Sequence, residues 1–247
     1  MLRRVLNGNQ LKLIAVIVML IDHIGYMIGR VVYPTLIFET ARFEQWNFIY
    51  YLFRCIGRTA FPIFCFMIAE GFLHTRDWKK YAVRLGVFGL ISEIPFDLMV
   101  SGKWSYPESQ NVFFSLLIGL LVLTLMRETA WRITGVEGWI GQLVVIALGC
   151  QLAIFLKTDY TWSGVLLIAI FYWFRSSRVS QCILGYLCMA VTAGDLRFQI
   201  ALLVPFVLLY YYNGERGREV KGLKWLFYWF YPVHMALVAV ICPLIFR

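Results

Sequence analysis

Charged residues are scarce in this 247-residue chain. They make up 15% of the sequence, whereas 61% of the residues are hydrophobic and 17% are aromatic. A soluble domain of this length could not bury so much apolar side chain, so the composition excludes that class and predicts an integral membrane protein. Acidic residues are the scarcer sign of charge, and the formal net charge is +9.

Several other signatures are also missing. The first apolar segment lacks the short core and small-residue cleavage site of a signal peptide, so we expect a retained span. The six cysteines lie within apolar stretches at spacings that resemble neither a metal site nor a disulfide framework, so we predict buried thiols and no metal. Because no linker, low-complexity tract or internal repeat stands out, we predict a single domain over residues 1–247.

Long apolar runs account for most of the sequence. Nine runs are bounded by charged or turn-rich segments, at about 11–33, 48–73, 81–100, 110–126, 139–156, 162–174, 180–193, 197–212 and 226–246. They predict an all-α, polytopic membrane bundle of about nine transmembrane helices. The runs near 162, 180 and 197 are shorter than the roughly 20 residues of a straight crossing, which favours helices that are buried in the bundle or broken.

The distribution of lysine and arginine predicts the orientation, because cytoplasmic loops retain these residues. With the N-terminus in the cytoplasm and nine crossings, the inner segments hold Arg3, Arg4, Lys12, Arg76, Lys79, Lys80, Arg84, Arg127, Arg132, Arg175, Arg178, Arg216, Arg218, Lys221 and Lys224. The outer segments hold only Arg42, Lys103, Lys157, Arg197 and Arg247. The C-terminus is then outside, and membrane topology explains most of the positive charge without a nucleic-acid partner.

Ionisable residues inside these runs are the strongest functional signal, because each is costly to desolvate. They are Asp22, His23, Arg30, Arg54, Arg58, Glu70, Glu93, Asp97 and His234. Two histidines at similar depth beside carboxylates favour an acid/base site. The alternative, for the arginines and at least one acid, is a buried ion-pair network that only holds the bundle together.

Helical spacing separates the members of this group. Asp22 and His23 are neighbours in sequence, so their side chains differ by about 100° in direction and cannot reach the same point. Arg54 and Arg58 are four residues apart and share a helix face. We therefore expect Asp22 or Glu93 to form an ion pair with Arg54 or Arg58, while His23 remains available for chemistry.

A pair of small residues lies near the end of the first run. Gly25 and Gly29 form a GxxxG pattern, which lets a neighbouring helix approach closely. The pattern predicts tight packing at this position and says little about function.

Two basic clusters lie in the predicted inner segments. They are Arg76, Lys79, Lys80 and Arg84, and Arg216, Arg218, Lys221 and Lys224. Their simplest explanation is the positive-inside rule together with anionic lipid headgroups. The functional alternative is a binding site for a phosphorylated cytoplasmic ligand, because lysine and arginine recognise phosphate by charge and hydrogen bonds.

Strings along the whole chain carry a family resemblance. They are LKLIAVIVMLIDHIG at 11–25, RCIGRTAFPIFCFMIAEGFLHTR at 54–76, RLGVFGLISEIPFDL at 84–98, NVFFSLLIGLL at 111–121, DYTWSGVLLI at 159–168 and FYWFYPVHM at 227–235. Together they resemble the TraX family, which is named for a conjugation-system membrane protein that acetylates the N-terminus of pilin. The chain is also similar to the wider class of integral-membrane acyltransferases.

The resemblance implies a multi-pass protein of the bacterial cytoplasmic membrane that uses acetyl-CoA as co-substrate. The acceptor would be an amine or hydroxyl of a protein, such as the pilin N-terminus, of a glycan or of a lipid headgroup. Acyl transfer needs a base for the acceptor's proton and donors for the oxyanion. His23 is the first choice of base, and the other candidate catalytic residues are Asp22, Glu93 and His234.

The remaining residues receive supporting roles under the same resemblance. Substrate or oxyanion contacts, or structural ion pairs, are expected of Arg54, Arg58, Glu70 and Asp97. Contacts with the CoA phosphates are expected of Arg76, Lys79, Lys80, Arg84, Lys221 and Lys224. No nucleophilic cysteine or serine motif is evident, which favours direct transfer in a ternary complex and leaves an acyl-histidine intermediate open.

Two other functions fit the intramembrane charges. A proton- or ion-coupled transporter would use the Asp, Glu and His side chains as a relay, although the apolar runs show no matching halves. A non-catalytic membrane component of a conjugation system would need the charges only as structural ion pairs.

Overall fold

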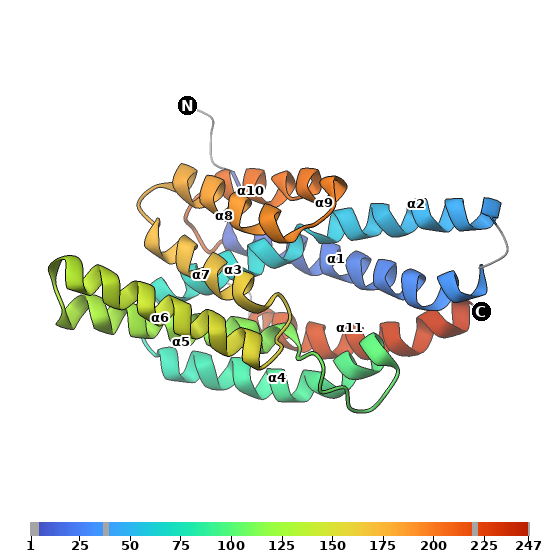
Figure 1. Ribbon diagram of the computed structural model, residues 1–247, viewed down its shortest axis with the longest axis horizontal. Helices are drawn as coiled ribbons and strands as arrows, with labels where there is room; N and C mark the ends of the chain where they lie inside the picture. The colour runs from blue at the N-terminus through green and yellow to red at the C-terminus, as the bar shows by residue number, and fades with distance from the viewer. Residues whose placement is uncertain (1–4, 37–39, 219–221, 247) are drawn as a thin grey trace. The chain divides into compact units, whose positions relative to one another are not determined.

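The computed structural model describes residues 5–36, 40–218 and 222–246, and no strand occurs in these ranges (Figure 1). The α-helices are α1 (Gly8–Met27), α2 (Thr40–Gly57), α3 (Ala60–His74), α4 (Trp78–Ser101), α5 (Val112–Arg132), α6 (Gly135–Phe155), α7 (Thr161–Trp173), α8 (Arg178–Thr192), α9 (Leu196–Ala201), α10 (Leu203–Tyr210) and α11 (Leu223–Ile245). The predicted all-α fold class is confirmed.

Five helical stretches of the described chain are long and apolar enough to cross a membrane. They are Gly8–Thr35, Ala41–His74, Val112–Arg132, Gly135–Phe155 and Leu223–Ile245. The protein is therefore a multi-pass membrane protein, although nine crossings are not confirmed. The three runs predicted to be short or broken form the shorter helices α7 and α8 and the broken pair α9 and α10.

The second predicted run forms two helices instead of one. Helix α2 ends at Gly57 and α3 begins at Ala60, with a turn at Arg58 and Thr59 between them. Pro62 explains the break, because it has no N–H to donate to the carbonyl of Arg58, and proline is well tolerated in the first turn of a new helix.

The chain divides into two compact units. Unit 1 contains residues 1–63, 94–105 and 193–247, and unit 2 contains residues 64–93 and 106–192. The single domain over residues 1–247 stays a prediction.

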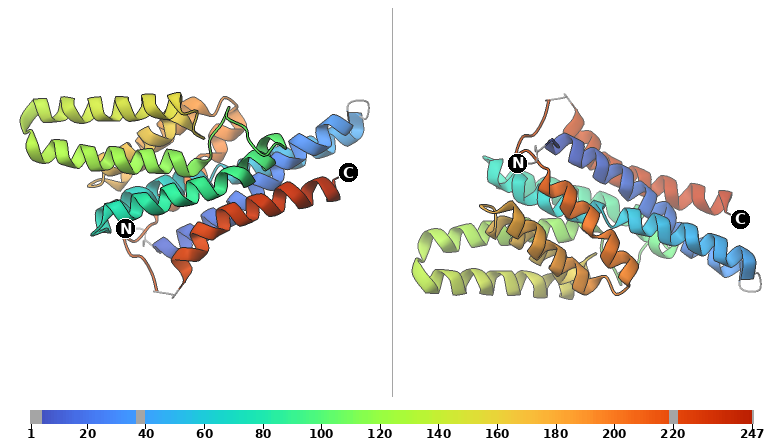
Figure 2. Two further views of the ribbon diagram at one scale, coloured as in Figure 1. Left: turned by 90° about the horizontal axis from the view of Figure 1, so that it is seen from below. Right: turned by 90° about the horizontal axis from the view of Figure 1, so that it is seen from above.

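In unit 1, α1 packs against both α2 and α11 (Figures 1 and 2). The approach of α2 depends on the predicted glycine pair. A Cβ at Gly25 would lie 2.7 Å from Cβ of Phe53, and one at Gly29 would lie 2.9 Å from the ring of Tyr50. The predicted close packing at this GxxxG is confirmed, with α2 as the neighbouring helix.

The start of α1 lies beside the segment that leads into α11. Asn7 and Gln10 form a capping box, in which each side chain accepts a hydrogen bond from the other's backbone N–H. The backbone N–H of Gly8 donates to the carbonyl of Glu215 at 2.8 Å. Helices α1 and α11 therefore start at the same end of unit 1 and run parallel, as the predicted topology requires.

The opposite end of α1 contacts the last turn of α4. After α1 the chain continues as a π-helix, Ile28–Val32, which carries Arg30. The Arg30 guanidinium donates to the carbonyl of Leu98 at 2.8 Å and to that of Met99. A helix end lacks partners for its last carbonyls, so Arg30 caps α4.

Unit 2 is built around the α5–α6 hairpin, which both views in Figure 2 show, with α7 packed against both helices and α8 against α7. Segments predicted to be cytoplasmic share one end of this unit. There, Glu70 of α3 lies 4.0 Å from Arg178 of α8. At the other end, Gln110 pairs with Thr158 through a backbone bridge. The alternation of the helices within the unit thus agrees with the predicted topology, while the side of the membrane stays a prediction.

Candidate active site

Two histidines of unit 1 form a direct hydrogen bond. Nδ1 of His23, on α1, lies 2.6 Å from Nε2 of His234, on α11. The ring planes differ by 4° and the ring centroids are 4.9 Å apart. This centroid separation is close to the N···N distance plus the two ring radii, so the rings lie edge to edge in one plane, as a linear N–H···N bond requires. The structure thus brings together the two histidines that the sequence predicts at similar depth.

The hydrogen-bond partners assign a tautomer to each neutral ring. Nδ1 of His234 lies 2.7 Å from the carbonyl oxygen of Phe230, which can only accept, so this nitrogen carries a proton. Nε2 of His234 is then the acceptor, and Nδ1–H of His23 donates to it. The lone pair of His23 is consequently on Nε2, which is the atom available as a base.

Aromatic rings enclose the pair. The ring of Phe230 lies 4.6 Å from that of His234, and Tyr231 approaches both histidine rings edge-on, at 6.2 Å and 5.6 Å. His234 itself is only 4% exposed. The position of the imidazoles is therefore set by packing as well as by the hydrogen bonds. The sequence analysis missed the carbonyl of Phe230, which accepts the hydrogen bond from Nδ1 of His234. Every residue has such a carbonyl, so residue types alone do not show which one contacts a histidine.

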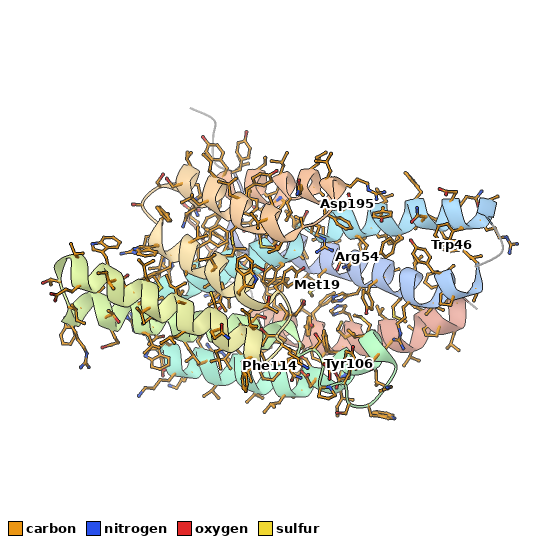
Figure 3. All side chains as sticks on the ribbon, in the orientation of Figure 1. Met19, Trp46, Arg54, Tyr106, Phe114 and Asp195 are labelled. Atoms are coloured by element: carbon orange, nitrogen blue, oxygen red, sulfur yellow. The ribbon has the colours of Figure 1, made fainter. Side chains whose placement is uncertain are left out.

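Asp22 points away from the histidines and toward α2. Its Oδ2 lies 2.5 Å from Nη1 of Arg54, and the two side chains are 15% and 16% exposed. Figure 3 labels Arg54, which projects from α2 toward α1. A Cβ at Gly57 would overlap the Asp22 side chain, so glycine is required here for the close approach. The predicted ion pair and the separate directions of Asp22 and His23 are both confirmed.

Arg58 lies in the turn that connects α2 to α3. Its guanidinium stacks on the ring of Phe198 at 4.6 Å, and its Nε is buried without an acceptor among the described residues. Asp97, on the part of α4 that belongs to unit 1, is 4% exposed. Unit 1 thus contains both histidines, Asp22, Arg54, Arg58 and Asp97 of the predicted site.

The two predicted glutamates belong to unit 2. Glu93 accepts a hydrogen bond from the side-chain amide of Asn111, whose carbonyl oxygen caps the N-terminus of α5. Glu70 lies 4.0 Å from both His74 and Arg178. These contacts fit structural roles, because they hold α4 to α5 and α3 to α8, and catalytic roles for the glutamates stay predictions.

The predicted phosphate-binding residues lie in different parts of the structure. Arg76, Lys79 and Lys80 are exposed near the start of α4, whereas Arg84 is partly buried. Lys224 is exposed at the start of α11, and Lys221 lies outside the described residues. Within the described ranges, no three His, Cys, Asp or Glu side chains gather as metal ligands, and the six cysteines are free thiols.

Comparison with known proteins places the chain in a family. A family model described as TraX protein matches residues 7–242. The chain is 29% identical over 250 residues to the "Probable fimbrial assembly protein FimC, serogroup H1" of Dichelobacter nodosus, with 94% of each chain covered. No solved structure matches. The match to the family model spans nearly the whole sequence, and the chain belongs to the TraX family.

Proposed function

We propose that this protein is an integral-membrane acyltransferase of a pilus or conjugation system. It moves an acetyl or other acyl group from acyl-CoA on the cytoplasmic side of the inner membrane to an amine or hydroxyl acceptor. The observation that carries the proposal is the His23–His234 pair, which holds an imidazole with a defined basic nitrogen beside the rings of Phe230 and Tyr231.

The proposed reaction uses Nε2 of His23 as the general base. This atom takes the proton of the acceptor's N–H or O–H while the acceptor attacks the thioester carbonyl, the C–S bond breaks, and the proton passes to the departing CoA sulfur. His234 accepts a hydrogen bond from Nδ1–H of His23 and so orients the ring, and it stabilises the positive charge while the imidazole holds the extra proton.

Two arginines support the chemistry in this proposal. Arg58 has an unpartnered buried Nε and can donate to the oxyanion of the tetrahedral intermediate or to an anionic group of the substrate. Arg54 is engaged by Asp22, so this pair positions α1 against α2 and keeps the His23 ring in place. Both assignments rest on contacts within unit 1.

The relative's name supports the choice of acceptor class. A protein that is named for fimbrial assembly suits an enzyme whose acceptor is a fimbrial or pilin subunit, including its N-terminal amine. A glycan or a lipid headgroup at the outer surface is the alternative acceptor for the same chemistry. The proposed partners are therefore acyl-CoA, the acceptor and the surrounding lipids.

The same name favours a second candidate function, a non-catalytic component of pilus assembly. The Asp22–Arg54 pair then serves only to stabilise the bundle. The transporter alternative rests on the intramembrane acidic residues and histidines alone.

Purified protein in lipid vesicles distinguishes these functions. The enzyme should transfer label from radiolabelled acetyl-CoA to purified pilin or, slowly, to water, and His23→Ala should abolish this while preserving the elution profile and thermal unfolding. Uptake of solute driven by a pH gradient, without acetyl transfer, would support transport. Absence of both activities in folded protein, together with normal pilus assembly by cells that express His23→Ala, would support the assembly component.

A further inference from the structure

Four arginines of unit 2 stack on aromatic rings at the end of the unit that contains the predicted cytoplasmic segments. They are Arg84 on α4, Arg127 on α5, Arg175 after α7 and Arg178 at the start of α8. Their rings are Tyr81, Phe72, Tyr172 and Phe66, respectively. We call these eight residues the arginine–aromatic cluster. The sequence predicted a ligand contact for Arg84 only, and for Arg127, Arg175 and Arg178 it predicted only a location in cytoplasmic segments.

The stacking contacts are close and connected. The guanidinium carbons of Arg127 and Arg178 lie 4.6 Å from their ring centroids, and that of Arg175 lies 4.7 Å away. The rings of Phe72 and Tyr172 are 5.6 Å apart and meet edge to face. The Arg127 and Arg175 stacks are therefore joined through their rings, and the ring of the Arg178 stack, Phe66, lies on α3 together with Phe72.

Arg84 joins the cluster through α3. Its guanidinium carbon lies 5.7 Å from the centroid of the Tyr81 ring. That ring packs on Gly71, where an added Cβ would lie 3.1 Å from it. Gly71 directly precedes Phe72, so the Arg84 and Arg127 stacks are adjacent on α3.

The cluster carries excess positive charge. Glu70 contacts one member, with its Oε1 4.0 Å from Nη2 of Arg178. Two acids of nearby segments are already paired outside the cluster, Asp77 with Lys80 and Glu128 with Arg132. Within the described ranges, Arg84, Arg127 and Arg175 form no ion pair with a carboxylate.

Hydrogen-bond donors remain available in this arrangement. Stacking uses the faces of the guanidinium groups, so their N–H edges can still donate hydrogen bonds. Nη1 of Arg175 donates to the carbonyl of Tyr172 at 3.0 Å, and Nη1 of Arg178 donates to Oε1 of Gln181 at 2.9 Å. The Nε of Arg84 is buried and has no acceptor among the described residues. Arg127 is exposed and makes no hydrogen bond to a residue of the described ranges, so its donors are open to a ligand from outside. A buried, unsatisfied N–H costs free energy unless a ligand supplies the acceptor.

We propose that the arginine–aromatic cluster binds the phosphate group of an organic phosphate. Phosphate matches the planar N–H edges of arginine and satisfies several charged donors at once. Two sources offer this chemistry, the nucleotide moiety of CoA and the headgroup of an anionic phospholipid. The site follows from the geometry of unit 2, and only its assignment to the acyl donor rests on the proposed function.

Binding to the full-length protein tests the site without any turnover. The first probe is 3′,5′-ADP, titrated in neutral detergent. The second is phosphatidylglycerol, compared with phosphatidylcholine in nanodiscs by native mass spectrometry. Arg84→Gln and Arg127→Gln should each weaken binding about tenfold, which corresponds to loss of one hydrogen bond to a charged group. Arg132→Gln is the matched control, because this exposed arginine at the end of α5 pairs with Glu128 outside the cluster.

The outcomes separate the two sources. Arginine-dependent binding of 3′,5′-ADP supports a free organic phosphate, whereas arginine-dependent retention of phosphatidylglycerol alone supports a lipid headgroup. Equal binding by wild type and both cluster variants, or an equal loss in Arg132→Gln, overturns the proposal. Arg127→Lys guards against misfolding, because it keeps the charge and should bind with intermediate affinity. His23→Asn should bind 3′,5′-ADP normally, so failure of the catalytic proposal is distinguishable from failure of the site.

Discussion

Replacement of Asp22 with Asn should strongly destabilise unit 1, because it leaves Arg54 buried without its carboxylate. The two groups are 2.5 Å apart and 15–16% exposed. Removal of one partner of a buried ion pair costs about 3–5 kcal/mol, and the residual exposure favours the lower end, about 3 kcal/mol. For a chain of this size that corresponds to a decrease in Tm of roughly 6–12 °C, measurable by thermal unfolding in detergent.

A second ion pair provides a control at the same distance. Nζ of Lys157 and Oε2 of Glu108 are also 2.5 Å apart, but their side chains are 51% and 61% exposed. Glu108→Gln should cost no more than about 1 kcal/mol. A double-mutant cycle with Asp22→Asn and Arg54→Gln should give a coupling energy of about 2 kcal/mol. Coupling near zero, or a Tm decrease no larger than that of Glu108→Gln, would refute the structural role of Asp22.

Three further outcomes follow from local contacts. Gly57→Ala should lower the Tm by displacing Asp22, at a cost of about 1–3 kcal/mol; an unchanged Tm would contradict the close approach. His234→Leu should reduce acyl transfer about 10- to 100-fold, whereas His234→Gln, which still offers an acceptor to the other histidine, should retain most of the rate. The hydrogen bond from the Lys80 backbone N–H holds the pKa of the exposed Asp77 carboxyl below its usual value. Its stabilising contribution should be present above about pH 4 and lost as the pH falls, and a carboxyl titration by NMR that gives an ordinary or raised pKa would contradict this.

Hydrophobic runs and periodicity predicted much of the fold and part of the candidate site. The apolar runs gave helices because each is long, continuous and bounded by charged or turn-forming residues. The spacing of Asp22 and His23 predicted that they face different neighbours, and α2 and α11 are those neighbours. Glycine at 25 and 29 predicted the close helix contact, because only the absence of a Cβ permits it.

Other features depend on three-dimensional pairing that periodicity does not encode. Helical spacing shows which face a residue occupies, but not which helix lies opposite that face. The sequence therefore could not show that Glu93 accepts a hydrogen bond from Asn111, the residue that caps α5. It also could not show that Arg127 stacks on the ring of Phe72. The break after Gly57 was missed because the run is apolar on both sides, although Pro62 offered a signal. The tautomers depend on a backbone carbonyl of α11, which residue types alone do not reveal.

The general base is the central claim, and His23→Asn tests it most directly. The Asn side chain can place an N–H near the position of Nδ1 and donate to His234, but it has no counterpart of the basic Nε2. With folding and 3′,5′-ADP binding unchanged, the rate of acetyl transfer from acetyl-CoA to pilin should fall about 10²- to 10⁴-fold. Transfer at the wild-type rate by His23→Asn would contradict the account.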